Sequence, residues 1–155
     1  MIAVSNSSAL IALDFLGRLD DLFGSLYGEV WIPPAVAKEV RPRVLPASLP
    51  IRALTQPVGP RIMRAALGPG ESEALALAIE IAADVVLLDD QTARRLALAL
   101  GLKISGTIGV LIEAKKRGLI PAVRPLIEML QRLPFHMTPA LYDEALQLSG
   151  ELTED

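Results

Sequence analysis

The chain has 155 residues, a hydrophobic content of 52% and a formal net charge of −3, which suit one domain with a single core. The absence of cysteine excludes disulfides, thiolate metal sites and cysteine nucleophiles, and no apolar run is long enough to predict a membrane span. The acidic balance means that any nucleic-acid site has to be local, and without a basic leader segment we expect a cytoplasmic protein.

The first half of the chain alternates short apolar runs with segments of helical periodicity. In order, it predicts a strand over residues 2–5, helices over 9–16 and 19–26, a strand over 30–32, a helix over 35–40, a short edge strand over 52–55 and a helix over 60–67. Asn6 or Ser7 is suited to cap the first helix, and the prolines at 33–34 open the third, because proline is tolerated in a first helical turn.

The second half continues the alternation. It predicts a helix over residues 71–82, a strand over 85–88, a helix over 91–100, a strand over 102–105 and helices over 108–117, 121–132 and 139–148. Short apolar strands that alternate with helices indicate an α/β fold, with a short parallel sheet flanked by helices on both faces. We expect one domain over residues 1–150, followed by a frayed C-terminal tail over 151–155.

Four acids surround the helix that begins near residue 71 and the strand that follows it. A glycine-rich turn over 68–70 opens the helix, Glu71 and Glu73 lie in its first turn, and the strand ends on Asp89 and Asp90. In a parallel sheet the carboxyl ends of all strands lie at one edge, which is where sites of open α/β sheets are found. A helix antiparallel to the strands begins at that same edge, so we expect these carboxylates to converge there.

Helical spacing separates the two glutamates. Glu71 falls on the same stripe as Ala74, Leu75 and Ala78, so it should face the sheet, whereas Glu73 lies at the edge of that stripe and should support it. The end of the strand likewise favours Asp89 over its neighbour as the residue at the sheet edge.

Two further segments bring polar groups to the same edge. Asn6 follows the first strand, and Glu39 lies on the helix after the second. Each acid has an ordinary structural explanation, because first-turn acids complement a helix dipole and the pair at 89–90 could cap the helix that follows. Their convergence favours a cation instead, since clustered carboxylates raise each other's pKa unless one neutralises them. With only oxygen ligands, that cation would be Mg²⁺ or Mn²⁺, which suits metal-assisted hydrolysis of a phosphodiester.

Four motifs and one further segment resemble a known family. They are VSNSSALIAL at 4–13, IPPAVAKEV at 32–40, GPGESEALALA at 68–78 and LLDDQTARR at 87–95, followed by SGTIGVL at 105–111. In this order and spacing they are similar to PIN domains, the nuclease fold of VapC-type toxins, and in particular to a prokaryotic branch of predicted nucleic-acid-binding PIN proteins.

The resemblance implies Mg²⁺- or Mn²⁺-dependent cleavage of single-stranded RNA. If the chain is a toxin, its partner would be an antitoxin protein. The catalytic acids would be Glu39, Glu71, Glu73, Asp89 and Asp90. The metal ligands would be Asn6, Glu39, Glu71, Asp89 and Asp90. Supporting roles would fall on the hydroxyls of Ser8 and Thr107 and on Arg94 and Arg95, which could grip phosphates next to the acidic pair.

The chain departs from the family at the first acid, where Asn6 stands in place of the usual aspartate. An amide oxygen can ligate a metal but brings no charge, so metal affinity should fall. The alternative is therefore a degenerate PIN domain that binds RNA or a protein partner without cleaving. The apolar stretch over 122–130 predicts a covered face, which is either a homodimer contact or part of the chain's own core.

Overall fold

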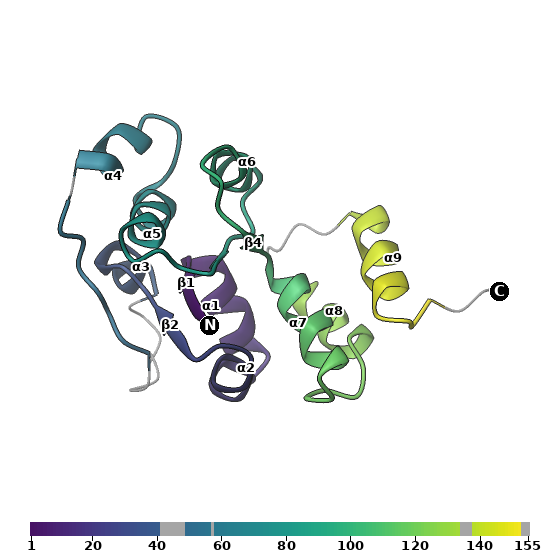
Figure 1. Cartoon of the computed structure of the whole chain (residues 1–155). Coiled ribbons are helices and arrows are strands. Elements are labelled where there is room, and N and C mark those ends of the chain that lie inside the picture. Colours follow the sequence, from purple (N-terminus) through teal and green to yellow (C-terminus); the bar gives the residue numbers. More distant parts are fainter. Residues whose placement is uncertain (41–48, 57, 134–137, 153–155) are drawn as a thin grey trace.

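A four-stranded parallel sheet forms the centre of the molecule, with the strand order β2-β1-β3-β4. The computed structural model describes residues 1–40, 49–56, 58–133 and 138–152. The strands are β1 (Ile2–Ser5), β2 (Glu29–Trp31), β3 (Val85–Leu87) and β4 (Ile104–Ser105). The predicted α/β class with a short, all-parallel sheet is confirmed, and the ribbon shows helices on both faces of the sheet (Figure 1).

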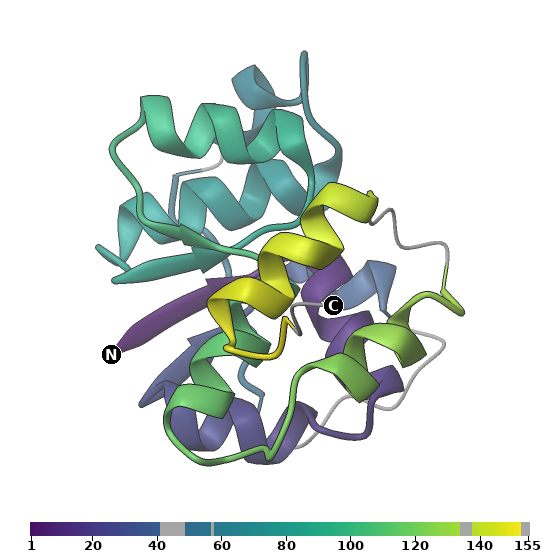
Figure 2. The ribbon, with the colours of Figure 1, turned by 90° about the vertical axis from the view of Figure 1, so that its right-hand side faces the viewer.

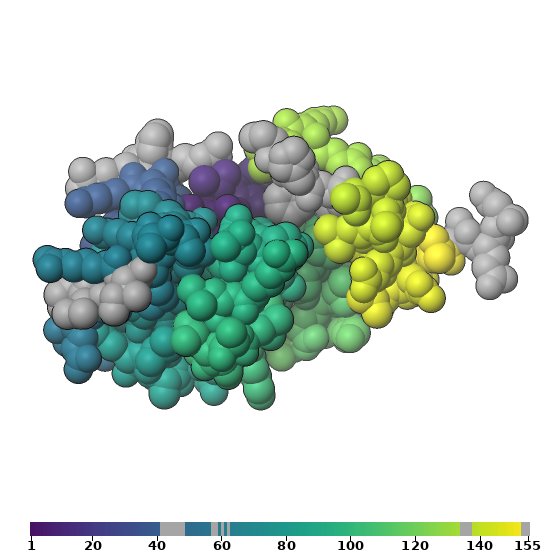
Figure 3. Space-filling view, turned by 90° about the horizontal axis from the view of Figure 1, so that it is seen from above, coloured from purple at the N-terminus to yellow at the C-terminus, as the bar shows by residue number. Residues whose placement is uncertain are grey.

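Helices connect the strands and continue beyond the last one. In chain order they are α1 (Ser7–Phe15), α2 (Leu19–Leu26), α3 (Pro34–Glu39), α4 (Val58–Met63), α5 (Pro69–Glu80), α6 (Gln91–Ala99), α7 (Thr107–Lys116), α8 (Arg124–Leu130) and α9 (Pro139–Leu148). Viewed from above, α4, α5 and α6 form one side of the molecule in teal and green, and α9 lies at the far end in yellow (Figure 3). None of the helices in the described ranges is long and apolar enough to cross a membrane.

Successive residues of β1 point to opposite faces of the sheet, as a strand requires, and each face has its own apolar cluster. Ala3 packs with Leu13 of α1 and Leu111 of α7, whereas Val4 packs with Leu75 of α5. All five side chains are fully buried. The central strand is therefore covered on both sides, which explains why it is apolar at neighbouring positions rather than only at alternate ones.

The expected edge strand over 52–55 is wrong. The pairing that the described residues show here is a single bridge between Ile51 and Ile32. Beyond it, the N–H groups of Thr55 and Gln56 donate to the carboxylate of Glu80 at the end of α5, so a helix side chain uses these two backbone donors. The Thr55 hydrogen bond in particular holds the pKa of Glu80 below its usual value.

The apolar stretch over 122–130 closes the chain's own core. Ile127 and Leu130 of α8 are fully buried in the cluster that contains Ala3, so no second copy is needed to cover them. The helix begins at Arg124, whereas the sequence predicted that it begins at residue 121.

A partly buried carboxylate, that of Glu151 just after α9, stabilises this late start. Glu151 accepts hydrogen bonds from the N–H groups of Val123 (2.7 Å) and Arg124 (3.2 Å) and pairs with Lys115 at 3.1 Å. It thereby ties the segment after α9 to the start of α8 and to the end of α7 (Figure 2). Glu151 thus belongs to the packed structure rather than to the tail expected over 151–155, of which residues 153–155 lie outside the described part.

We expect the substitution Glu151→Gln to destabilise the protein by about 1–3 kcal/mol at pH 7. Burial alone would raise the pKa of Glu151, but the donors from Val123, Arg124 and Lys115 outweigh it and lower the pKa from 4.5 to about 2. Because the folded-state pKa is depressed, the stabilisation is complete above pH 4.5 and is lost as the pH falls towards 2.

Urea unfolding of wild type and variant between pH 7 and pH 2 measures this difference. Glu144→Gln is the matched control, because Glu144 is an exposed acid on α9 for which the described structure shows no hydrogen bond. A destabilisation by Glu151→Gln that stayed constant down to pH 2 would show that the ionised carboxylate of Glu151 does not stabilise the fold.

Candidate functional site

The carboxyl edge of the sheet gathers the polar residues that the sequence singles out. Asn6 directly follows β1, and Asp89 lies two residues after the end of β3. Glu39 ends α3, and Glu71 and Thr107 lie in the first turns of α5 and α7. In Figure 2 β1 runs from left to right, so this edge faces the right-hand side of that view.

Glu39 is held between two elements by two hydrogen bonds. Its Oε2 accepts from the hydroxyl of Ser7 at 2.6 Å, and its Oε1 accepts from the N–H of Gly70 at 2.9 Å. A Cβ atom at Gly70 would lie 2.6 Å from Oε1 and would also collide with Oε2, so only glycine leaves room for the carboxylate. The side chain of an exposed residue is thereby fixed at the N-terminal end of α5, where the helix dipole favours a negative charge.

Glu73 makes the reciprocal contact. Its Oε2 accepts a hydrogen bond of 2.7 Å from the N–H of Ala35, in the first turn of α3. Glu39 of α3 therefore caps the start of α5, while Glu73 of α5 caps the start of α3. Glu73 therefore holds the start of α3 in place against α5.

Among the described residues, none forms a hydrogen bond or an ion pair with Glu71 of α5. Glu71 is half-buried. Its carboxylate lies back over Gly68, where a Cβ atom would be 2.8 Å from Oε2. Glu71 therefore keeps its full capacity to bind a ligand.

Asp89 is bound through both oxygens to the start of α7. Its Oδ1 accepts from the N–H of Thr107 at 2.7 Å, and its Oδ2 accepts from the Thr107 hydroxyl at 2.5 Å. Gly106 leaves space beside it, since a Cβ atom there would lie 2.8 Å from Oδ1 and 3.0 Å from Nη1 of Arg94. Arg94 in turn donates to the Leu88 carbonyl at 2.8 Å, so this cation is fixed next to the acid.

The neighbouring acid has a capping role. Asp90 is the N-cap of α6, and its Oδ2 accepts from the N–H of Ala93 at 2.8 Å. The sequence left open that the pair at 89–90 caps the helix that follows. This holds for Asp90, which caps α6, whereas Asp89 is bound to the start of α7. Arg95 is exposed and makes no hydrogen bond or ion pair within the described part of the chain.

Asn6 is fully buried and is oriented by the helix that it caps. Its Oδ1 accepts from the N–H of Ala9 at 3.2 Å, as an N-cap does. Its Nδ2 is buried and has no acceptor among the described residues. The atom at this position that lacks a partner is thus a hydrogen-bond donor, not an acceptor.

A family model described as a PIN domain matches residues 2–151. The chain belongs to the PIN-domain family. This confirms the resemblance inferred from the sequence motifs, and it indicates a nuclease-type domain related to nucleic acids, in a family that generally uses divalent metals. Comparisons with curated proteins and with solved structures found no significant match.

The acids of this PIN domain are of the chemical type that binds a divalent cation. In the described part of the structure, however, they do not surround one point. No group of three or more Asp, Glu or His side chains in the described ranges lies close enough to hold a metal ion. The oxygens that could bind a metal are nevertheless carboxylate oxygens, which Mg²⁺ and Mn²⁺ prefer as ligands. An oxygen that accepts one hydrogen bond keeps a lone pair that can bind a metal. Glu71 makes no hydrogen bond or ion pair with a described residue, so its oxygens are free to accept a ligand.

The hydroxyl that contacts an acid near β1 differs from the one that the resemblance implies. Ser7 donates to Glu39, whereas Ser8 is half-buried and makes no hydrogen bond with a described residue. Sequence alone could not separate two adjacent serines. Gly70 did carry a signal, because a glycine in the first turn of a helix often marks a close approach of another group.

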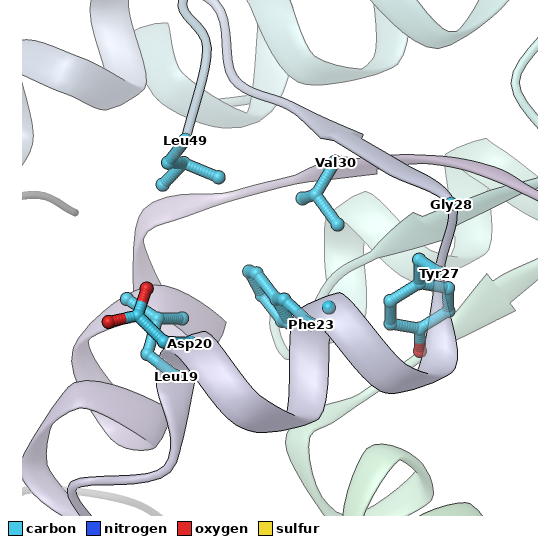
Figure 4. Close-up of a pocket in the computed structure, with 8 residues that line it drawn as sticks. Leu19, Asp20, Phe23, Tyr27, Gly28, Val30 and Leu49 are labelled. Atoms are coloured by element: carbon cyan, nitrogen blue, oxygen red, sulfur yellow. The ribbon is translucent and has the colours of Figure 1, made fainter. Parts of the chain in front are cut away.

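A separate hollow of about 270 Å³ lies between α2 and β2 (Figure 4). Its lining includes Phe23, Tyr27 and Val30, and none of the acids at the sheet edge contributes to it. Burial raises the pKa of Tyr27 to about 12, with Glu113 adding to the shift and Arg117 opposing it. The Tyr27 phenol is therefore protonated at neutral pH and offers this hollow no base.

Proposed function

We propose that this PIN domain is a Mg²⁺- or Mn²⁺-dependent ribonuclease that hydrolyses phosphodiester bonds of single-stranded RNA. The observation that supports it best is the arrangement of Glu39 and Asp89 at one sheet edge, each fixed by donors at a helix start, with the unrestrained Glu71 beside them. Membership of the PIN-domain family favours a nuclease, and carboxylate oxygens are the ligands that Mg²⁺ and Mn²⁺ prefer.

Glu39, Glu71 and Asp89 would hold the cation, with Asn6 and Asp90 nearby and Glu73 supporting α3. When bound, the cation supplies charge stabilisation at the phosphate and a more acidic water. Thr107 keeps both oxygens of Asp89 in place through its N–H and hydroxyl.

Two positively charged side chains of α6 would position the RNA. Arg94 is fixed next to Asp89 by its bond to the Leu88 carbonyl, and Arg95 is exposed one residue further on. Guanidinium groups bind phosphate oxygens in a bidentate manner, which would orient the backbone of the RNA relative to the acids.

The similarity to VapC-type toxins extends the proposal to a toxin of a toxin–antitoxin pair. Its site of action would be the cytoplasm, and its partners would be an antitoxin protein and a second copy of the chain. Co-expression with a small protein encoded next to it, followed by purification of a stable complex with suppressed cleavage, tests this extension.

Cleavage of a fluorescently labelled single-stranded RNA in Mn²⁺, Mg²⁺ or EDTA tests the main proposal. We expect metal-dependent cleavage that falls by about 100-fold or more in Glu71→Gln and Asp89→Asn. Glu144→Gln, on α9, is the matched control and should cleave as wild type does. Cleavage that is equally fast in EDTA, or that survives both site substitutions, would refute the proposal.

A second function is RNA binding without cleavage. It is favoured by Asn6, which offers the edge a buried N–H instead of a carboxylate, and by the lack of a gathered group of three acids among the described residues. Fluorescence anisotropy with the same RNA in EDTA separates the two functions. Tight binding that persists after Mn²⁺ is added, with no cleavage product, would establish the binding protein.

A further inference from the structure

We infer that Ser7, acting with the N–H of Gly70, is the positioning residue for the acid Glu39. The catalytic consequence of this inference rests on the proposed ribonuclease function. The contact itself rests only on the geometry, so the two can be tested separately.

The two donors approach Glu39 from different elements. Ser7 is the first residue of α1 and donates to Oε2 at 2.6 Å, and Gly70 lies in the first turn of α5 and donates to Oε1 at 2.9 Å. Each carboxylate oxygen therefore has one protein donor and retains a lone pair that faces elsewhere. The pair of bonds defines both the position of the carboxylate and the rotation of its plane.

Glu39 needs such a constraint because little else restrains it. It is the last residue of α3 and is exposed to solvent. A free glutamate side chain loses rotamer entropy when it is fixed, so an unrestrained Glu39 would sample many positions. The hydroxyl of Ser7 is the only side-chain donor to Glu39 that the described structure shows.

The other hydroxyls near the end of β1 do not contact Glu39 in the described structure. Ser5 donates to the carbonyl of Asn6 at 3.0 Å, and Ser8 makes no hydrogen bond with a described residue. Asn6 supplies the N-cap of α1, which leaves the Ser7 hydroxyl free to point away from its own helix. A hydroxyl is also suited to orient a metal-binding acid, because it carries no positive charge that would compete with the cation.

Steady-state kinetics with the labelled RNA at saturating Mn²⁺ tests the positioning role. We expect Ser7→Ala to lower kcat about tenfold while KM for the RNA stays unchanged, because the acid is displaced but the phosphate contacts are not. Ser7→Thr restores the hydroxyl and should recover most of the kcat. Ser25→Ala, an exposed serine of α2, is the matched control and should match wild type.

A double-mutant cycle on stability provides the readout that does not need activity. In urea unfolding, Ser7→Ala should lower the transition midpoint of wild type but not that of Glu39→Ala, because the partner is already absent there. If wild type itself fails to cleave RNA, the proposed function falls, and the cycle alone decides whether Ser7 holds Glu39.

Three results would overturn the inference. The first is equal effects of Ser7→Ala in both backgrounds of the cycle. The second is a loss of kcat that Ser7→Thr does not recover. The third is wild-type kinetics in Ser7→Ala together with a loss in Ser8→Ala, which would return the role to the neighbouring hydroxyl.

Discussion

Replacing Asn6 by aspartate is expected to make the stability of the protein depend on a divalent cation. The introduced carboxylate keeps the cap, because one oxygen can accept from the N–H of Ala9 as Oδ1 does now. Its second oxygen takes the place of Nδ2, which is buried and lacks a partner among the described residues. A buried carboxylate with one oxygen left without a partner costs about 2–4 kcal/mol, and the acids at the same edge increase that cost.

Thermal unfolding in EDTA and in rising Mn²⁺ measures the effect. In EDTA the Tm of Asn6→Asp should fall by roughly 10 °C below that of wild type, and saturating Mn²⁺ should restore it. Calorimetric titration should show Mn²⁺ bound at least about tenfold more tightly than by wild type, and RNA cleavage should become faster.

Asn6→Ser is the control for this change, since serine also caps a helix but adds no charge. It should show no response to Mn²⁺ beyond that of wild type. If Asn6→Asp were as stable as wild type in EDTA and indifferent to Mn²⁺, Asn6 would not lie at a metal site.

Replacing Gly70 by alanine is expected to separate activity from stability. The added Cβ would lie 2.6 Å from Oε1 of Glu39 and would force the carboxylate out of its place. Because Glu39 is exposed, its side chain can move into solvent without disturbing the core, and alanine in a helix gains up to about 1 kcal/mol over glycine. We expect the free energy of unfolding to change by less than about 1 kcal/mol while kcat falls by about 100-fold.

Urea unfolding and RNA cleavage of the same preparation measure both quantities. Gly24→Ala is the matched control, because Gly24 lies within α2 and a Cβ there meets no atom within 4 Å. It should be slightly more stable than wild type and equally active. Full activity in Gly70→Ala would show that the position of Glu39 is not important for the reaction.

The parallel sheet and its helices could be predicted because their signals are local. Short apolar runs separated by helical periods leave few alternatives, and the positions of Asn6 and Asp89 after the parallel strands β1 and β3 followed from that topology. Asn6 was also among the predicted caps of α1, since side chains that cap helices act on residues next to them in the chain.

The partners of the acids could not be predicted, because they are distant in sequence. Ser7 and Gly70 both contact Glu39 from more than 30 residues away, and nothing local distinguishes Ser7 from Ser8. The expected strand over 52–55 failed for a similar reason, since the N–H of its last residue, Thr55, donates to Glu80 from a distant part of the chain.

The exchange of caps between α3 and α5 gives this protein an internal reporter of cation binding. If Glu39 turns to a cation, the Gly70 amide loses its acceptor, while the Ala35 amide keeps Glu73. In an NMR spectrum of the unmodified protein, the Gly70 amide proton should shift upfield and exchange faster with solvent as the site fills. The Ala35 proton would serve as the reference in the same spectrum, so occupancy could be followed without altering any residue of the site.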